Sequence, residues 1–223
     1  MTPLEELQAR ANPAQAARMP AYHKASRPYL GIPVPEIATL ADRWRAELTL
    51  EDRIALAAGL WQTNIHEARV AAAKLLAQAR IRPDEATWDL IVSWVPDFDA
   101  WAIADHASIA GQKRLVADPA RLDTVEGWVA SQHMWTRRAA LVMTLPWTKQ
   151  NFPKAQDLAI RSRVLGWCAT LASDHDWFIQ KAVAWWLRDL SKHDAEATRA
   201  FLAAHGQRMK AFARNEAARH LVA

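Results

Sequence analysis

The chain's capacity for chemistry lies mainly in its tryptophans, which make up 12 of its 223 residues. Several of them stand beside a carboxylate or an arginine within sequence that favours helix. Trp101 and Asp105 are four residues apart, so on a helix they share one face. An electron-rich ring and an anion that point the same way attract positive charge. We therefore expect this pair to stabilise a cation.

The segments around these residues indicate one helix after another, with no sustained period of two. One helix is expected from Pro35, and the next begins after Thr49, an N-cap residue followed by acids. Further helices are expected at 65–80, 84–95, 99–115, 122–132, 134–145, 154–173, 175–191, 194–204 and 207–221. Six glycines, and prolines placed between the helical stretches, favour short connections. This pattern predicts an all-α fold, an α-solenoid of stacked helix pairs that forms a single domain over 1–223.

A loose pattern recurs along the chain: an aromatic residue near a helix start, a basic residue, and then an alanine-rich apolar run. The clearest cases are 61–73, 135–141 and 178–188. Alanines allow helices to approach closely, and the basic residues would then line one face of the stack. A curved, basic face suits a nucleic-acid duplex, whose charge lies on its backbone.

Composition narrows the class of protein. Hydrophobic residues make up 51% of the chain, enough to bury a sizeable core, yet no apolar run approaches the length of a membrane span. The N-terminus resembles a helix start and not a signal peptide, so we expect a protein of the cytoplasm. Cys168, the single cysteine, is expected to be a small buried apolar side chain. The net charge of +4 permits a polyanionic partner without requiring one.

Five separated blocks resemble the bacterial DNA alkylation repair glycosylases of the AlkD type in order and approximate spacing. The blocks are Tyr22–Ile32, Leu60-Trp61 with His66-Glu67, the pair Trp101 and Asp105, Trp135-x-x-Arg138-Ala139-Ala140, and Phe178–Ala182 followed by Trp185-x-Leu187-Arg188. The resemblance implies a superhelix of HEAT-like repeats that removes N3- and N7-alkylated purines from DNA. It also implies that the damaged base is not flipped out of the duplex. The residues give no separate evidence on this point.

The resemblance implies roles for particular residues. Trp101, Asp105 and Trp185 match the family's catalytic cluster, and Arg138 matches its DNA-contacting arginine. The expected DNA-binding set is Tyr22, Lys24, Arg138, Lys181 and Arg188. The implied partner is double-stranded DNA that contains alkylated purines, with no metal and no cofactor. A monomer would suffice to hold a duplex. The protein would be associated with the nucleoid when it is bound to DNA.

The expected chemistry can be checked without the resemblance. Alkylation at N3 or N7 makes a purine positively charged, so it leaves without protonation and no general acid is needed. Positive charge then develops on the deoxyribose, and a catalyst should offer it a carboxylate and π faces while water attacks. Asp105 can stabilise this cation and orient the water. Trp101 and Trp185 would each add about 1–2 kcal/mol of cation–π attraction.

Two neighbouring pairs require a choice, because adjacent residues on a helix face different ways. We favour Arg138 over Arg137 for DNA, and Trp185 over Trp186 for function, with Trp186 as a packing residue. The remaining tryptophans considered are expected in the core or between repeats. They are Trp44, Trp88, Trp94, Trp128, Trp147, Trp167 and Trp177.

Other interpretations stay open. Trp101 could be a core residue and Asp105 a solvated acid, which would leave a non-catalytic HEAT-repeat scaffold that binds DNA structure or another protein. A third possibility is a solenoid for an acidic peptide. The histidines form no metal motif, and His106 is isolated in the sequence. The acids of the segment 174–176 are expected to cap the helix that begins near Trp177.

Overall fold

The computed structural model describes residues 1–221, and every regular element in that range is a helix. The α-helices are α1 (Pro3–Gln8), α2 (Pro13–Ala16), α3 (Met19–His23), α4 (Val34–Glu47), α5 (Leu50–Gln62), α6 (His66–Leu76), α7 (Glu85–Trp94), α8 (Trp101–Ala117), α9 (Leu122–Trp128), α10 (Met134–Met143), α11 (Ala155–Leu171), α12 (Trp177–Ser191), α13 (Ala195–His205) and α14 (Ala211–Ala217). Short 3₁₀ turns are η1 (Val95–Asp97), η2 (Pro119–Arg121), η3 (Leu145–Thr148) and η4 (Gly206–Arg208). The predicted helices are confirmed to within a few residues, whereas α2 and α3 were not predicted.

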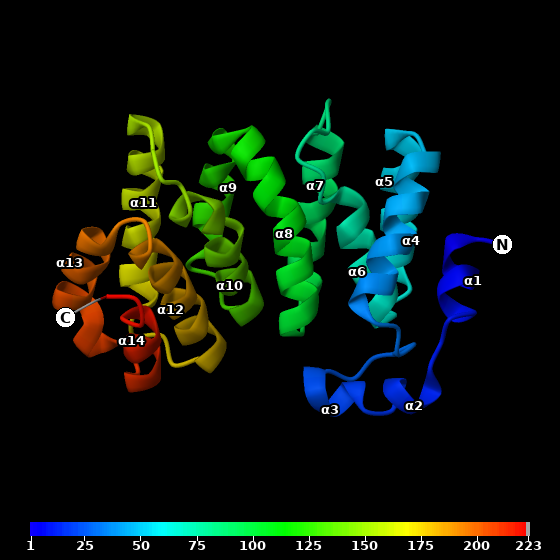
Figure 1. Cartoon of the computed structure of the whole chain (residues 1–223), viewed down its shortest axis with the longest axis horizontal. Coiled ribbons are helices and arrows are strands. Elements are labelled where there is room, and N and C mark those ends of the chain that lie inside the picture. The colour runs from blue at the N-terminus through cyan, green and yellow to red at the C-terminus, as the bar shows by residue number, and fades with distance from the viewer. Residues whose placement is uncertain (222–223) are drawn as a thin grey trace. The chain divides into compact units, whose positions relative to one another are not determined.

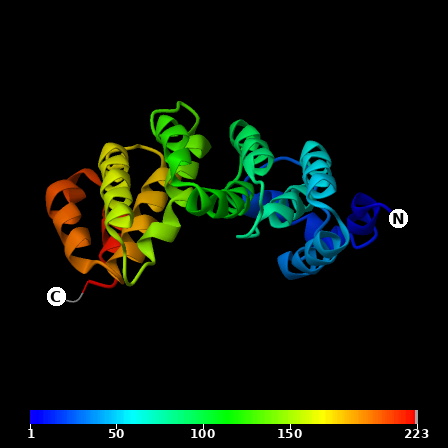
Figure 2. The same cartoon turned by 90° about the horizontal axis from the view of Figure 1, so that it is seen from above.

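The described chain forms two compact units, Met1–Ala117 and the residues from Asp118 onward, here called unit 1 and unit 2. In unit 1, α6 packs against α4, α5 and α8, and α7 packs against α5 and α8. Figure 2 shows α6 between α4 and α5. Alternate helices therefore form two layers, α4–α6–α8 and α5–α7.

Unit 2 repeats this arrangement. α12 packs against α10 and α14 in one layer, and it also contacts α11 and α13 of the other. α9 packs against α10, its neighbour in the sequence (Figure 1). Within each unit, the predicted stacking of helix pairs is confirmed; the prediction of a single domain over 1–223 stays a prediction.

Tryptophan and alanine side chains form the centre of unit 1. The rings of Trp61 and Trp94 are stacked 4.3 Å apart, and both are buried. Trp61 Nε1 donates a hydrogen bond of 3.0 Å to Asp97 Oδ2, which satisfies its polar atom. On α6, Ala68 and Ala71 have no exposed surface, so neighbouring helices approach this helix closely. The alanine-rich runs seen in the sequence thus serve helix packing.

Several arginines are buried and bind the connections between helices. The Arg114 side chain is fully buried, and its guanidinium contacts Asp84 at 2.8 Å and the Ala79 carbonyl at 3.1 Å. Arg161 donates from Nε to the Trp147 carbonyl at 2.7 Å. These cations compensate backbone oxygens that would otherwise be buried without partners. They are structural groups and not part of a basic surface.

The burial of individual side chains tests the sequence expectations. Trp44, Trp88, Trp94, Trp147 and Trp167 are buried as predicted, and Trp128 is half-buried. Trp177 is 48% exposed and so is not a core residue; it begins α12, and its ring lies against Phe212 of α14, which is the alternative expected position between helices of the stack. Cys168 is buried as expected, and burial raises the pKa of its thiol. Among residues 1–221, no helix combines the length and apolarity needed to cross a bilayer.

The buried carboxylate of Glu67 holds the loop between α3 and α4. Glu67 lies in the first turn of α6 with no exposed surface, and it accepts hydrogen bonds from the amides of Leu30 at 2.9 Å and Gly31 at 2.7 Å. Gly31 has φ of +77°, and a Cβ there would lie 2.3 Å from the Asn12 carbonyl oxygen. Only glycine fits this turn. The loop is therefore fixed to α6 on one side and to α2 on the other.

We expect Glu67→Gln to lower the free energy of unfolding by about 1–3 kcal/mol, because one amide N–H₂ would face backbone donors in a buried site. Urea denaturation would measure the change. Glu47→Gln is the matched control, since Glu47 is exposed at the end of α4, and it should alter stability little. Equal stability of the two variants would contradict this role of Glu67.

Candidate active site

Trp101 and Asp105 lie one turn apart at the start of α8, and both are half-buried. The Trp101 ring meets Tyr22 of α3 edge-on, with centroids 5.7 Å apart, and it lies 5.5 Å from the His23 ring. Tyr22 is 67% exposed. The structure thus brings together two residues, Tyr22 and Trp101, that were predicted separately for the site. Their aromatic surface and the Asp105 carboxylate belong to one region of unit 1.

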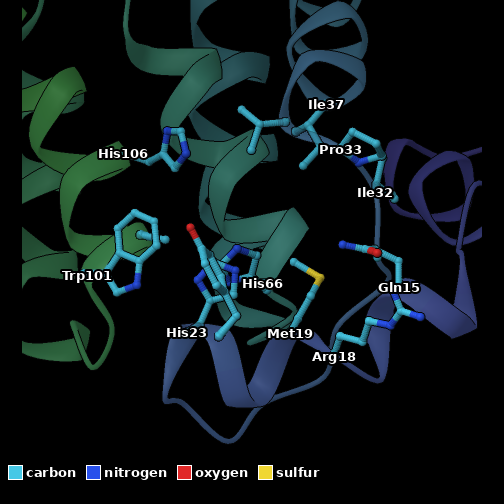
Figure 3. Close-up of a pocket in the computed structure, with 14 residues that line it drawn as sticks. Gln15, Arg18, Met19, His23, Ile32, Pro33, Ile37, His66, Trp101 and His106 are labelled. Carbon is cyan, nitrogen blue, oxygen red and sulfur yellow. The ribbon is translucent and has the colours of Figure 1, made fainter.

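A cavity of about 470 Å³ adjoins Trp101 within unit 1. Figure 3 shows Trp101 and His106 on one side of it, with Gln15 and Ile32 on the opposite side. Its wall includes Met19, His23, Ile37, His66, Trp101 and His106. Asp105 is not among the residues that line the cavity.

Three histidines of this cavity were not predicted as site residues. Burial lowers the pKa of His66 to about 3, assisted by repulsion from Arg27 and, when it is protonated, from His23; burial lowers the pKa of His106 to about 4, assisted by Lys74. Burial also lowers the pKa of His23. All three imidazoles are therefore neutral near pH 7.

The geometry of this cluster leaves polar atoms without partners. The rings of His23 and His66 are 4.2 Å apart, and the buried Nδ1 atom of each has no hydrogen bond within the described residues. Sequence analysis missed the cluster because its members come from α3, α6 and α8. The available signal was the presence of His23 and His66 in two of the quoted motif blocks.

The segment after α3 carries two further cations. Lys24 is exposed and adopts a left-handed conformation, with φ of 55°, where α3 ends. Arg27 is buried and paired with Asp99. Burial, followed by the nearby charge of Arg69, lowers the pKa of Arg27 to about 10, so it stays charged at neutral pH. Lys24 is thus the better placed of the two to meet a phosphate.

In unit 2, Asp189 organises the side chains of α12 that were predicted to act on DNA. The half-buried Trp185 donates from Nε1 to Asp189 Oδ2 at 3.0 Å. The Arg188 guanidinium lies 3.3 Å from Asp189 Oδ1 and also pairs with Glu216. Trp186 has no exposed surface, which confirms its expected packing role.

The two adjacent arginines of α10 both bind protein groups. Arg138 is 5% exposed, and its guanidinium donates to the Phe178 carbonyl at 3.0 Å. Arg137 contacts Asp174 at 2.9 Å and Asp176 at 2.6 Å. By contrast, Lys181 is exposed, with Nζ 4.8 Å from the Trp177 ring centre. The DNA contacts of Arg138, Lys181 and Arg188 stay predictions.

The expected helix cap at 174–176 was wrong. Asp176 precedes α12 but its side chain makes no capping hydrogen bond, because Arg137 binds both carboxylates instead. Asp174, His175 and Asp176 are near enough to one another to share a metal ion. Since Arg137 already neutralises the two acids, this geometry does not indicate a metal site.

Comparison with known proteins decides the family. A family model described as DNA alkylation repair enzyme matches residues 4–221. The chain belongs to this family. The resemblance inferred from the five blocks is thereby confirmed, and it assigns the chain an enzymatic role in DNA alkylation repair. No curated protein matches the chain significantly.

Solved structures support the fold. A predicted DNA alkylation repair enzyme from Enterococcus faecalis is 23% identical, with a TM-score of 0.78 over 96% of this chain and 97% of that one. AlkD2 from Streptococcus mutans is 17% identical, with a TM-score of 0.66 over the whole of both chains. The smu.31 protein of the same organism is 18% identical, with a TM-score of 0.64 over 85% of this chain and 93% of that one. These likenesses show a shared repeat-helical fold.

The neutral histidines make stability depend on pH. In the unfolded chain His66 and His106 take up protons below their ordinary pKa of 6.5, whereas in the folded chain their pKa values are about 3 and about 4. The free energy of unfolding should therefore be independent of these two groups above pH 6.5. It should decrease as pH falls toward 4, by up to about 1.4 kcal/mol per pH unit for each histidine. Thermal unfolding between pH 7.5 and 4.5 would show this.

The His66→Phe variant should show a shallower dependence, because it has lost one of these groups. His220→Phe is the control, since His220 is exposed, and its pH dependence should equal that of the wild type. If the stability of His66→Phe depended on pH in the same way as that of the wild type, His66 would take up its proton at the same pH in the folded and unfolded chains, which would contradict a lowered pKa.

Proposed function

We propose that the protein is a DNA glycosylase that hydrolyses the N-glycosidic bond of N3- and N7-alkylated purines in duplex DNA and leaves an abasic site. The observation that carries this proposal is the placement of Trp101 and Asp105 on one face at the start of α8, half-buried, in a member of the DNA alkylation repair enzyme family. A ring and a carboxylate so placed favour a substrate that becomes positively charged at its sugar.

The reaction needs no general acid. The bond between the sugar C1′ and the base nitrogen breaks, and its electron pair goes to the base, which leaves as a neutral molecule. The positive charge passes to the deoxyribose, where the Asp105 carboxylate stabilises it. Water then attacks C1′ and gives its proton to Asp105 or to solvent. Because the carboxylate interacts more strongly with the sugar cation than with the intact nucleotide, it lowers the barrier.

The aromatic residues would add π surface to the interaction with the substrate. Tyr22 supports the Trp101 ring through its edge-on contact, and Asp189 fixes the Trp185 indole through Nε1. We propose that both indoles face the sugar or the DNA backbone during the reaction. A ring held in one orientation loses less conformational freedom when the substrate binds.

Duplex DNA would be held mainly by exposed cations. Lys24 and Lys181 are exposed, whereas Arg138 and Arg188 hold protein groups. We therefore assign most of the phosphate neutralisation to the two lysines and a smaller share to the arginines. Salt-dependent affinity is expected for any such contact.

Asp105→Asn should decrease the rate of 7-methylguanine release from a duplex by at least about 100-fold, because it removes the charge that stabilises the transition state. Its affinity for the duplex should not decrease. Asp89→Asn, an exposed acid of α7 in the same unit, should retain wild-type activity.

Full base release by Asp105→Asn would exclude the mechanism. A wild-type protein that binds alkylated duplex in a salt-dependent manner but releases no base would instead support the scaffold interpretation.

Lys181→Ala should weaken binding to duplexes of any sequence and decrease the slope of log affinity against log salt by about one. Lys181→Arg keeps the charge and should keep the slope. Fluorescence anisotropy with a labelled duplex at several salt concentrations measures both. An unchanged slope for Lys181→Ala would remove this lysine from the DNA contact.

A further inference from the structure

Two further exposed lysines of unit 2 lie beside the residues proposed to act on DNA. Lys149 directly follows η3, and Lys192 directly follows α12. The ammonium groups of both lie beside one carboxylate, that of Asp189, with Nζ to oxygen distances of 3.8 Å and 3.9 Å. The Arg188 guanidinium reaches the same carboxylate at 3.3 Å. Three cations from the ends of η3 and α12 therefore converge on one acid.

Asp189 does not need the two lysines for its own compensation. It is 7% exposed, and both of its oxygens accept hydrogen bonds: Oδ2 from Trp185 Nε1, and Oδ1 from Arg188. A buried carboxylate is stabilised when its oxygens are bonded and its charge is paired. The indole and the guanidinium meet both needs, so the lysines add positive charge beyond what the carboxylate requires.

Positive charge exceeds negative charge in this cluster. Arg188 also pairs with Glu216 of α14, which Arg219 binds at 2.8 Å. Within the residues that the structure describes, the ion pairs of the cluster join four cations to the two carboxylates of Asp189 and Glu216. The cations are Lys149, Arg188, Lys192 and Arg219. The cluster therefore attracts an anion.

The stability of the fold does not account for the two lysines. The Lys149 side chain is 59% exposed and that of Lys192 is 47% exposed. Ion pairs this long and this exposed contribute little to stability, because water screens them. A cation at the end of a helix is favourable, which fits Lys192, but Lys149 lies outside the helix. Both ammonium groups can turn toward an anion in solution.

The helix face indicates which anion. Lys181, Trp185, Arg188 and Lys192 are spaced by four, three and four residues, so they lie along one face of α12. Cations with an indole ring between them suit a nucleic-acid strand, whose phosphates carry the charge and whose other parts can lie against an aromatic ring. Lys181 and Arg188 are about 10 Å apart along the helix axis. They would therefore meet different phosphates.

We propose that Lys149, Arg188 and Lys192 form a clamp for one backbone phosphate of DNA, on the strand that passes Trp185. Asp189 gathers the three cations and, through its bond to Nε1, holds the indole beside them. That this strand carries the damaged nucleotide rests on the proposed glycosylase function, whereas the phosphate site rests on the cluster itself.

The test is fluorescence anisotropy of the whole protein with an undamaged, labelled duplex at several salt concentrations. The Lys149→Gln/Lys192→Gln double variant should decrease the slope of log affinity against log salt by about one, the value for a single phosphate, because Arg188 alone stays bound to acids. Its affinity should decrease about fivefold at about 0.15 M salt. Each single variant should lose less, since the other lysine still holds the phosphate.

Two control variants accompany this measurement. Lys149→Arg/Lys192→Arg keeps both charges and should keep the slope. Arg199→Gln removes an exposed charge from α13, in the other layer of unit 2, and should bind as the wild type does. Because the substituted lysines are exposed, their variants should retain the wild-type midpoint in urea.

An unchanged slope in the double variant would overturn the clamp, as would a wild type that binds no duplex. A loss of about two would also overturn it, because the lysines would then meet separate phosphates. Polyglutamate is the probe for an acidic protein partner. If the double variant lost affinity for polyglutamate but kept the wild-type slope with duplex, the cluster would serve a protein and not DNA.

Base release from alkylated duplex is measured separately, so the two proposals can fail independently. Release by the wild type, together with an unchanged slope in the double variant, rejects the clamp alone. The expected loss of slope, with no release by the wild type, rejects the glycosylase alone.

Discussion

The site of unit 1 depends on one buried carboxylate. Glu67 has no exposed surface, so its charge must be compensated inside the protein, and the amides of Leu30 and Gly31 compensate it. Helices as short as α2 and α3 are unstable by themselves. Because Glu67 and the turn at Gly31 fix the loop that follows them, Tyr22 and His23 are held against α8. The aromatic contact with Trp101 and the neighbouring cavity follow from that constraint.

Charge serves structure and function differently in this protein. The basic residues that recur along the sequence predicted a basic face, but Arg114 and Arg161 are buried on backbone carbonyls, and Arg137 is bound by two acids. These cations connect helices. Recognition of a phosphate backbone then falls to exposed side chains such as Lys24 and Lys181. In the cavity beside Trp101, by contrast with the buried arginines, burial keeps the imidazoles neutral.

The sequence predicted much of the fold because amphipathic helices are encoded locally. The spacing of apolar residues located α4 to α14, and the same spacing chose Trp185 over the fully buried Trp186. The short helix α3 was missed, since contacts with distant residues hold it. Helical spacing also could not decide whether Trp177 lies in the core or between repeats: its ring packs on Phe212 of α14, and both residues stay exposed.

The sequence by itself determined the order of helices, the family and the shared face of Trp101 and Asp105, because each depends on spacing along the chain. Only the tertiary structure decided which cations are buried, and which histidines meet. His23, His66 and His106 come from three helices, and their neutrality results from burial that no single segment specifies. Helical periodicity fixes the direction of a side chain, but its partner is set by packing between residues far apart in sequence.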